Sequence, residues 1–490
     1  MAVAERPLPS PRALPRPGRW SKLLREHWLI ALLVAAGATI RLLAMLAYTP
    51  ALFFPDSWGY ISAGLTGAFV GLPSVHPVGY SLLIRLLTLP DRSLVQLIAI
   101  QHLAIIGVGC AIYLTLLRAR LPRWAAAAAA APVLLDGFTV TLEQYVMSDT
   151  FFTVLLFSAA LIVAWPRLSG SGSTPKQVGL RRALLAGLVL AGAALDREAM
   201  PFVFPIFFVY LIWIRVGWRA IVAFTLAAAL PLLAYSAMID ARYHVFGMTA
   251  TSGWTLYGRV AGFASCQGVK LAAPERALCE TAAQRASHPD APDWYIWGPS
   301  PANRIFHPDT QSIAQVAGTN RVLESFAKTM ILAHPLGFVN VTLTDFVDYL
   351  TPGATPYGNA VSATSLPRSA RLEARDRSVQ RADLPGLRIR VRPPAGIVRA
   401  YRRLVHVPRV LLGLLALATL AGLAARVAAR REIFLFGGGA LLLLLGTAAT
   451  GGFGIRYLLP AVPLLAVGGA LALAGLLRRR SSSSAAPASS

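Results

Sequence analysis

Long runs of hydrophobic residues, separated by short polar connections, dominate the chain. A helix of about 20 apolar residues crosses the roughly 30 Å hydrocarbon core of a bilayer, so the pattern predicts transmembrane helices. The short runs 183–195 and 202–214 either extend into their polar flanks or enter the membrane and return. We expect ten spans, at 28–48, 94–117, 124–141, 150–165, 183–195, 202–214, 220–239, 407–425, 433–450 and 457–477.

One long polar segment, 240–405, interrupts these runs and is rich in Pro, Gly, Asp, Trp and Arg. We expect it to fold as an extracytoplasmic domain. Its stretch 328–350 is apolar but contains His334, Asp345 and Asp348, and a charge at the bilayer centre costs about 2.5–3.5 kcal/mol. An amphipathic helix lying on the membrane is therefore expected there, with an eleventh span as the alternative. The expected organisation is a disordered cytoplasmic tail at 1–27, an N-terminal transmembrane module at 28–239, this domain, C-terminal transmembrane helices at 406–477 and a cytoplasmic tail at 478–490.

The composition supports an α-helical polytopic membrane protein. Hydrophobic residues make up 56% of the chain, charged residues 14%, and the mean hydropathy is +0.57. The net charge of +24 is divided among short loops and one long segment. Such a distribution does not form the basic face of a nucleic-acid-binding module. Membrane lipids, anionic ones in particular, are the expected partners, and nucleic acid is not.

The positions of the basic residues predict the orientation in a cell membrane. Arginine and lysine are concentrated before the first span and directly after the last, so both termini are expected in the cytoplasm. The basic groups around Arg118, Arg167, Arg215 and Arg426 then fall on the inner side. A cleaved signal peptide is the competing interpretation of residues 1–48. The apolar run continues past Arg41 without a convincing cleavage site, which favours retention as an anchor.

Two of the three cysteines lie in the expected extracytoplasmic domain. Cys266 and Cys279 are separated by twelve residues, whereas Cys110 lies within a span. An oxidising compartment favours a disulfide between the first two, with two free thiols as the alternative. The sequence contains no CxxC or Cys/His cluster that would indicate structural zinc.

The first outer connection carries a carboxylate, Asp56, in the motif FFPDSWGY. A carboxylate beside aromatic residues at a membrane surface can act as a general base. The alternative is that Asp56 caps the following helix. Trp58 and Tyr60 either stack on a sugar or belong to the aromatic belt that membrane proteins place at the interface.

The second outer connection, TLEQYVMSDT, holds Glu143, Tyr145 and Asp149. If the helices pack together, Asp56 and Asp149 can share a pocket, with one as base and the other positioning an acceptor hydroxyl or binding a divalent cation. The alternative is that Asp149 caps the span that begins at Thr150.

Two further outer helix ends carry arginine. Arg197 lies in ALDREAMP and can bind a phosphate or pair with an acidic neighbour, Asp196 or Glu198. Arg456 lies in GGFGIRYLLPAVP, where prolines loosen the start of the last span and free backbone N–H groups beside a guanidinium. The alternative for Arg456 is a side chain that extends along the span towards water.

The order of these motifs resembles the GT-C glycosyltransferases, which use polyprenyl-phosphate-linked sugars. It runs from an arginine in the first span through PDSWGYISAG, HPVGYSLLIR and an acidic MSD turn to a final RYLLPAVP. Protein O-mannosyltransferases and lipid A aminoarabinose transferases belong to this superfamily. The resemblance covers residues 30–240 and 450–470 and implies a GT-C-like bundle of about ten transmembrane helices with interfacial helices and an extracytoplasmic domain.

The resemblance also implies roles for single residues. Asp56 matches the first-loop catalytic Asp, Asp149 the second acidic position and Arg456 a contact to the lipid phosphate. His76 falls where relatives have a basic or His-Pro motif before an interfacial helix, here 77–89, with a helix cap or buried donor as the alternative. Ser57 replaces the second acidic residue of many relatives, which weakens the case for a metal site built from adjacent carboxylates.

The implied reaction is an inverting transfer of a hexose or pentose from a polyprenyl phosphate to a glycan, lipid or protein acceptor of the cell envelope. Asp56 would deprotonate the acceptor hydroxyl, and Arg197, Arg456 and Arg41 would stabilise the leaving phosphate. Trp58, Tyr60, Glu143 and Tyr145 are the candidate contacts to sugar or acceptor. A transporter or lipid flippase and a polysaccharide ligase or polymerase are the alternative functions.

Overall fold

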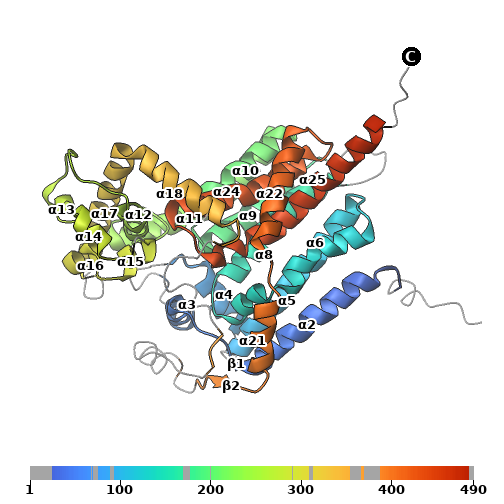
Figure 1. The fold of residues 1–490 in the computed structure, drawn as a ribbon, viewed down its shortest axis with the longest axis horizontal. Helices are drawn as coiled ribbons and strands as arrows, with labels where there is room; N and C mark the ends of the chain where they lie inside the picture. Colours follow the sequence, from blue (N-terminus) through green and yellow to red (C-terminus); the bar gives the residue numbers. More distant parts are fainter. Residues whose placement is uncertain are drawn as a thin grey trace, which may run out of the picture.

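The structure is a computed structural model that describes residues 25–67, 69, 76–88, 93–168, 177–198, 200–289, 291–307, 313–353, 366–368, 384 and 387–484. The expected tail up to residue 24, residue 89 of the expected interfacial helix and residues 485–490 lie outside this part of the chain. Figure 1 shows a bundle of long helices with a smaller helical lobe at one end. The protein is a helical membrane protein.

The N-terminal module contains the helices that the apolar runs predict, and two shorter helices in the first outer connection. The third expected span is bent by 45° because Asp136 ends one helix and starts the next, accepting a hydrogen bond from the Thr139 backbone N–H at 2.7 Å. The helices are α2 (Trp28–Ala47), α3 (Pro55–Thr66), α4 (Gly79–Thr88), α5 (Leu94–Arg118), α6 (Arg123–Leu135), α7 (Gly137–Gln144), α8 (Asp149–Ala164), α9 (Leu180–Asp196), α10 (Met200–Trp213) and α11 (Trp218–Tyr243).

The C-terminal part returns to the bundle and packs α25 against α22. Helix α25 also approaches the segment before α24 closely enough to require glycine at one point, because a Cβ on Gly468 would lie 2.4 Å from the backbone nitrogen of Gly437. Gly437 belongs to a π-helical turn, Phe434–Gly438, between two α-helical segments. The helices are α21 (Ala395–Leu404), α22 (Arg409–Ala424), α23 (Arg430–Ile433), α24 (Gly439–Thr450), a 3-10 turn (Ile455–Leu458) and α25 (Ala461–Ser484).

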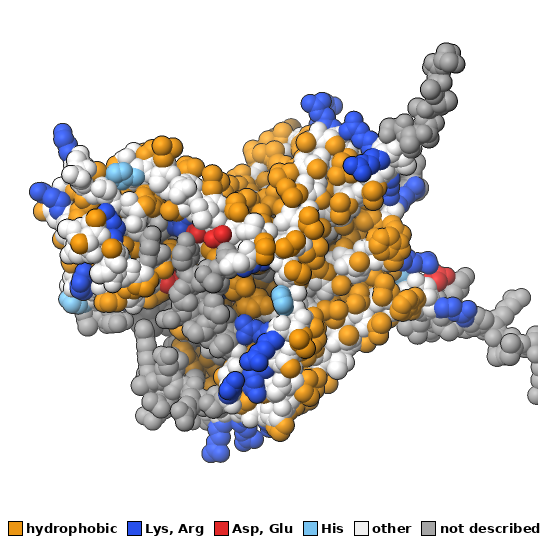
Figure 2. Space-filling view, in the orientation of Figure 1, with side chains coloured by type: hydrophobic (Ala, Val, Ile, Leu, Met, Phe, Trp, Pro, Cys, Tyr) orange, Lys and Arg blue, Asp and Glu red, His pale blue; other side chains and the backbone are white. Residues whose placement is uncertain are grey.

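Five helices of the described chain are long and apolar enough to cross a membrane, or up to eight when each bent pair counts as one span. Every one of the ten expected spans coincides with a helix or a bent pair of helices. Figure 2 shows hydrophobic side chains over the outside of the bundle, with basic side chains gathered where α25 ends. Large apolar side chains exposed on helices of the bundle include Leu103, Leu188, Leu230 and Leu417. The number of crossings and the side on which each terminus lies stay predictions.

Several basic connections meet at one end of the bundle. Arg478 donates to the Arg120 carbonyl at 2.9 Å, and Arg123 pairs with Glu26 at 2.9 Å. At the same end, Arg167 pairs with Glu432 at 3.0 Å. Figure 1 shows the starts of α2 and α6 and the end of α25 there, away from the lobe.

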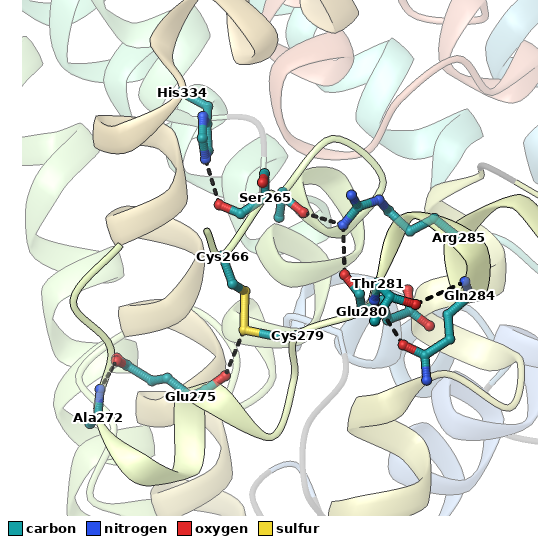
Figure 3. The surroundings of a disulfide bond; sticks show 11 residues. Ser265, Cys266, Ala272, Glu275, Cys279, Glu280, Thr281, Gln284, Arg285 and His334 are labelled. Atoms are coloured by element: carbon teal, nitrogen blue, oxygen red, sulfur yellow. Dashed lines mark hydrogen bonds between the residues drawn. A yellow bond between two sulfur atoms is a disulfide. The ribbon is translucent and has the colours of Figure 1, made fainter. Parts of the chain in front are cut away.

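The lobe has a hydrophobic core of its own, built around Tyr257, Leu323 and Met330. Its helices are α12 (Ser252–Ala261), α13 (Ala273–Arg276), α14 (Ala282–Ala286), α15 (Pro292–Trp297), α16 (Pro301–Phe306) and α17 (Ile313–Ala333). A disulfide joins Cys266 to Cys279, as the sequence predicts. Figure 3 shows this bond below His334, which contacts the Ser265 carbonyl through Nε2 at 2.7 Å.

The prediction of a single continuous helix over 328–350 is wrong. The chain ends α17 at Ala333 and begins α18 (Pro335–Asp348) after a bend of 98°. Proline disfavours helical geometry in the residue before it, and His334 accordingly leaves the helical region. The bend turns α18 from the lobe towards α24 of the bundle.

The expected domain 240–405 does not form one packed unit. Residues 254–330 build the lobe core, whereas Val391, Ala395, Val398 and Tyr401 pack with Ile40, Tyr48 and Tyr145 of the N-terminal module. A short antiparallel ribbon fixes this second contact, with β1 (Tyr48–Thr49) paired to β2 (Arg390–Val391). Helix α21 therefore belongs structurally to the bundle.

Candidate active site

The local sequence around Asp56 leaves its carboxylate available for longer-range contacts. Helix α3 begins with Pro55, whose fixed φ suits the first helical position. Asp56 is not the cap, because Ser57 accepts a hydrogen bond from the Phe54 N–H at 2.8 Å and donates to the Val146 carbonyl at 2.7 Å. Ser57 thus anchors the helix start to the second outer connection.

Asp56 contacts two basic side chains that are remote in the sequence. Arg456 Nη1 donates to Asp56 Oδ2 at 3.1 Å, and His76 Nε2 lies 3.6 Å from Asp56 Oδ1. Burial by itself would raise the pKa of the Asp56 carboxyl, but His76 and Arg456 outweigh it and hold that pKa well below its ordinary value. Asp56 is therefore ionised at neutral pH.

A second ion pair joins Arg197 to Asp149. Arg197 follows the last residue of α9 in an extended conformation, and Asp149 is the first residue of α8, after the N-cap residue Ser148. Asp149 therefore does not cap its helix, and Arg197 takes a partner on another helix in place of an acidic neighbour in its own turn. Asp149 is 2% exposed and Arg197 19%, so the guanidinium is the member of the pair that a ligand can reach.

Tyr457 lies between the two arginines. The guanidinium of Arg197 is 4.5 Å from its ring centroid, and that of Arg456 is 5.2 Å away. Both distances fit cation–π contacts, which hold two positive groups over one aromatic ring. The two ion pairs thus form one cluster of alternating charge.

Tyr60 and His76 form one wall of this cluster. Their rings stack at 4.8 Å, and Tyr60 Oη is 3.2 Å from Ser148 Oγ. Burial, together with the nearby Asp56 charge, raises the pKa of Tyr60, so the phenol remains protonated. Its side chain is 6% exposed, and contact with a sugar would require rearrangement.

The backbone ties together the two outer connections that carry the carboxylates. Leu52 N–H donates to the Gln144 carbonyl at 2.8 Å, and Val146 N–H donates to the Leu52 carbonyl at 3.0 Å. These bonds form a parallel bridge between Leu52 and Tyr145. Together with the Ser57 contact, they fix α3 relative to the start of α8.

The structure does not place Arg41 and Glu143 with the ligand-accessible groups. Arg41 binds Glu143 through Nη2 and Oε1 at 2.7 Å and donates to the Leu134 carbonyl at 2.6 Å. His102 Nδ1 also contacts Glu143, at 2.6 Å. Arg41 is 2% exposed and Glu143 0%, so we retain neither the phosphate role of Arg41 nor the acceptor role of Glu143.

The aromatic residues expected to contact an acceptor are also enclosed. Trp58 is buried and stacks on Phe53 at 4.7 Å. Tyr145 is buried in the core that joins α2 to α21. Both side chains serve packing, because apolar contacts cover their faces.

Sequence reasoning missed Tyr457, His102 and Ser148. Tyr457 was visible beside Arg456 in the RYLLP motif, and only the fold shows that it also contacts Arg197. His102 lies on α5 within an apolar run, so its partner on α7 could not be deduced from spacing.

The donor set does not fit a divalent cation without rearrangement. Within the residues that the structure describes, no three His, Cys, Asp or Glu side chains gather as metal ligands. Asp56 and Asp149 each face an arginine instead, and a cation would have to displace these guanidinium groups.

Comparison with known proteins finds likeness only at the level of structure. No family model matches the sequence, and no curated protein matches it. The chain is similar to Archaeoglobus fulgidus oligosaccharyltransferase AglB in complex with an inhibitory peptide and a dolichol-phosphate, with a TM-score of 0.40 and 14% identity over 95% of this chain and 53% of that chain. It is also similar to ArnT from Cupriavidus metallidurans bound to undecaprenyl phosphate, with a TM-score of 0.34 and 13% identity over 90% of this chain and 77% of that chain.

The chain spans about half the length of the archaeal oligosaccharyltransferase. Another structure of the archaeal protein was obtained with Zn and sulfate. At these TM-scores the likeness does not assign a reaction to this chain.

Proposed function

We propose that the protein is a membrane glycosyltransferase of the GT-C type, which transfers a sugar from a polyprenyl phosphate to an acceptor hydroxyl. The contact between Asp56 and Arg456 at 3.1 Å carries the proposal, because it joins a carboxylate and a guanidinium that lie 400 residues apart in the sequence. A base for the acceptor and a cation for the leaving phosphate are the two groups that this reaction requires.

In the proposed reaction, Asp56 takes the proton from the acceptor hydroxyl as its oxygen attacks the anomeric carbon. The bond between that carbon and the phosphate oxygen breaks, and the electron pair leaves with the lipid phosphate. Attack from the face opposite the leaving group inverts the anomeric centre. Arg456 and Arg197 stabilise the developing charge, and both are 19% exposed.

The ion pairs provide a way to couple donor binding to base activation. Before the donor binds, Arg456 pairs with Asp56, and His76 lies beside the same carboxylate. A phosphate that binds Arg456 competes with Asp56 for the same guanidinium. The carboxylate then loses part of its stabilisation and becomes a stronger base when the sugar is in place. Asp149 remains buried and orients Arg197.

Guanidinium groups supply the positive charge in this proposal, and no step passes through a metal ion. We place the site on the extracytoplasmic side because the basic connections gather at the opposite end of the bundle. The mixed charge of the cluster at helix ends favours a transferase over a transporter, whose charged groups lie near the midplane with access from both sides. A separate buried polar cluster, Arg41 with Glu143 and His102, is sealed by packing.

The test uses purified protein in lipid nanodiscs with a panel of sugar-loaded polyprenyl phosphates and product detection by mass spectrometry. We expect Asp56→Asn and Arg456→Gln to lose transfer, and the exposed control Asp240→Asn to keep it. Unchanged product from Asp56→Asn, at equal protein abundance, would remove the proposed base. Product that is insensitive to both variants would show that transfer does not use this site.

A further inference from the structure

The connection that leads into the turn bearing Arg456 is held by residues outside the charge cluster. It runs from Gly451 to Gly454, between α24 and the 3-10 turn, and Gly452 adopts a φ of 79°. Tyr349 donates from its hydroxyl to the Gly452 carbonyl at 2.8 Å and accepts from the Gly454 N–H at 3.0 Å. Its ring also contacts Phe453 edge-on at 4.9 Å. The end of α18 thus fixes the path of this connection.

A buried ion pair lies against the same connection. Arg259 of α12 donates from Nη1 to Asp345 Oδ2 of α18 at 2.5 Å, with side-chain exposures of 2% and 0%. A Cβ on Gly452 would lie 3.3 Å from Asp345 Oδ2 and 3.4 Å from Arg259 Nη1. The ion pair therefore contacts the backbone four residues before Arg456.

A buried ion pair such as Arg259–Asp345 stabilises a fold less efficiently than apolar packing does. Burying two charges costs desolvation energy, and a hydrophobic pair of similar size often stabilises a protein as well or better. Among the described residues, Arg259 also leaves Nε and Nη2 buried without a hydrogen-bond partner. Apolar side chains could join α12 to α18 at lower cost. The charged pair instead imposes one geometry at the point where the lobe, α18 and the Gly451–Gly454 connection meet.

We propose that Arg259 and Asp345 are positioning residues that hold the Gly451–Gly454 connection so that Arg456 faces Asp56 and the donor phosphate. The structure of the lobe and the geometry of the phosphate site are then coupled. Because α12 belongs to the disulfide-linked lobe, the folding of the lobe sets the position of a guanidinium in the bundle. This inference rests on the proposed role of Arg456.

The experiment is a double-mutant cycle read out by binding of undecaprenyl phosphate to the full-length protein in nanodiscs. The variants are Arg259→Gln, Asp345→Asn and Arg456→Lys, alone and combined. Arg276→Gln, an exposed arginine of the same lobe, is the matched control. Thermal unfolding and protease resistance report the integrity of the lobe.

We expect Arg259→Gln and Asp345→Asn each to weaken probe binding about tenfold while the control leaves it unchanged. In the Arg456→Lys background we expect either change to add less than twofold, because each acts through Arg456. A purely structural role would weaken binding by the same factor in both backgrounds, which would overturn the inference. Unfolding of the lobe in either variant would also overturn the inference, because the Arg259–Asp345 pair would then stabilise the lobe and not the connection.

The outcomes also separate this inference from the proposed function. If Arg456→Lys weakens binding and the Arg259 and Asp345 variants stay within twofold of wild type, the positioning role is wrong and the phosphate site stands. If Arg456→Lys leaves binding unchanged, the proposed phosphate contact fails, and the positioning role fails with it.

Discussion

Asp56→Asn should have opposite effects on donor binding and on transfer. The substitution keeps the size of the side chain and removes its charge, so Arg456 loses a partner at 3.1 Å. Two unit charges at this separation attract by about 5 kcal/mol at an effective dielectric constant of about 20. Both side chains are partly exposed, at 17% and 19%, and hydration reduces the net value. We take about 1–2 kcal/mol, between the values for exposed and buried pairs.

This net attraction opposes phosphate binding in the wild-type protein, because the phosphate must share Arg456 with Asp56. Its removal should tighten binding of a polyprenyl phosphate by about 5-fold to 30-fold, since 1.4 kcal/mol corresponds to a factor of ten. Transfer should fall by at least about 100-fold, because the acceptor loses its base.

The assay compares wild type and Asp56→Asn for undecaprenyl phosphate binding in nanodiscs and for product formation. Asp240→Asn controls for the loss of one negative charge elsewhere. Weaker binding by a folded Asp56→Asn protein would refute the competition between phosphate and carboxylate. Transfer within threefold of wild type would refute the role of Asp56 as base.

Four further predictions concern other parts of the structure. Glu143→Gln should lower the free energy of unfolding by about 3–5 kcal/mol, because it leaves Arg41 buried without its charged partner; a change in donor binding without loss of thermal stability would contradict this. Cys266→Ser should destabilise the lobe by about 3 kcal/mol, as expected for a disulfide that closes a loop with a sequence separation of 13, and limited proteolysis would detect it. Arg197→Gln should weaken polyprenyl phosphate binding more than Asp149→Asn does, because only the arginine is accessible; equal binding by Arg197→Gln and wild type would count against its phosphate role. The stability advantage of wild type over Asp56→Asn should not shrink between pH 7 and pH 5 and should shrink below about pH 4. A carboxyl whose pKa is lowered by folding adds stability above its ordinary value of 3.8 and loses it as the pH falls. An advantage that shrinks between pH 7 and pH 5 would contradict the pKa shift.

The sequence predicts the helices well because membrane spans depend on local apolar runs. The starts of α2 and α5 at Trp28 and Leu94 fall where the apolar runs begin. The break at His334 was missed, although Pro335 was a local signal for it. The packing of α21 against the N-terminal module depends on contacts across more than 240 residues, and no local pattern indicates it.

For the site, sequence patterns find charged residues but not their partners. Asp56, Asp149, Arg197 and Arg456 were all recognisable as charges at outer helix ends. Arg41 and Glu143 carry the same kinds of charge, and only their burial in the fold distinguishes them from groups that a ligand can reach. The burial and the pairing of a charged side chain depend on the tertiary structure, so they cannot be predicted from composition and spacing.

In the proposed transferase, the bridge between Leu52 and Tyr145 limits how the site can adapt to different sugars. Because the segments bearing Asp56 and Asp149 are hydrogen-bonded to each other, neither can retreat alone to make room for a bulkier donor. The arginines come from other segments, at the end of α9 and before α25, and these can shift without breaking that bridge. A change of substrate in related enzymes should therefore alter the guanidinium-bearing turns first and leave the spacing of the acids unchanged.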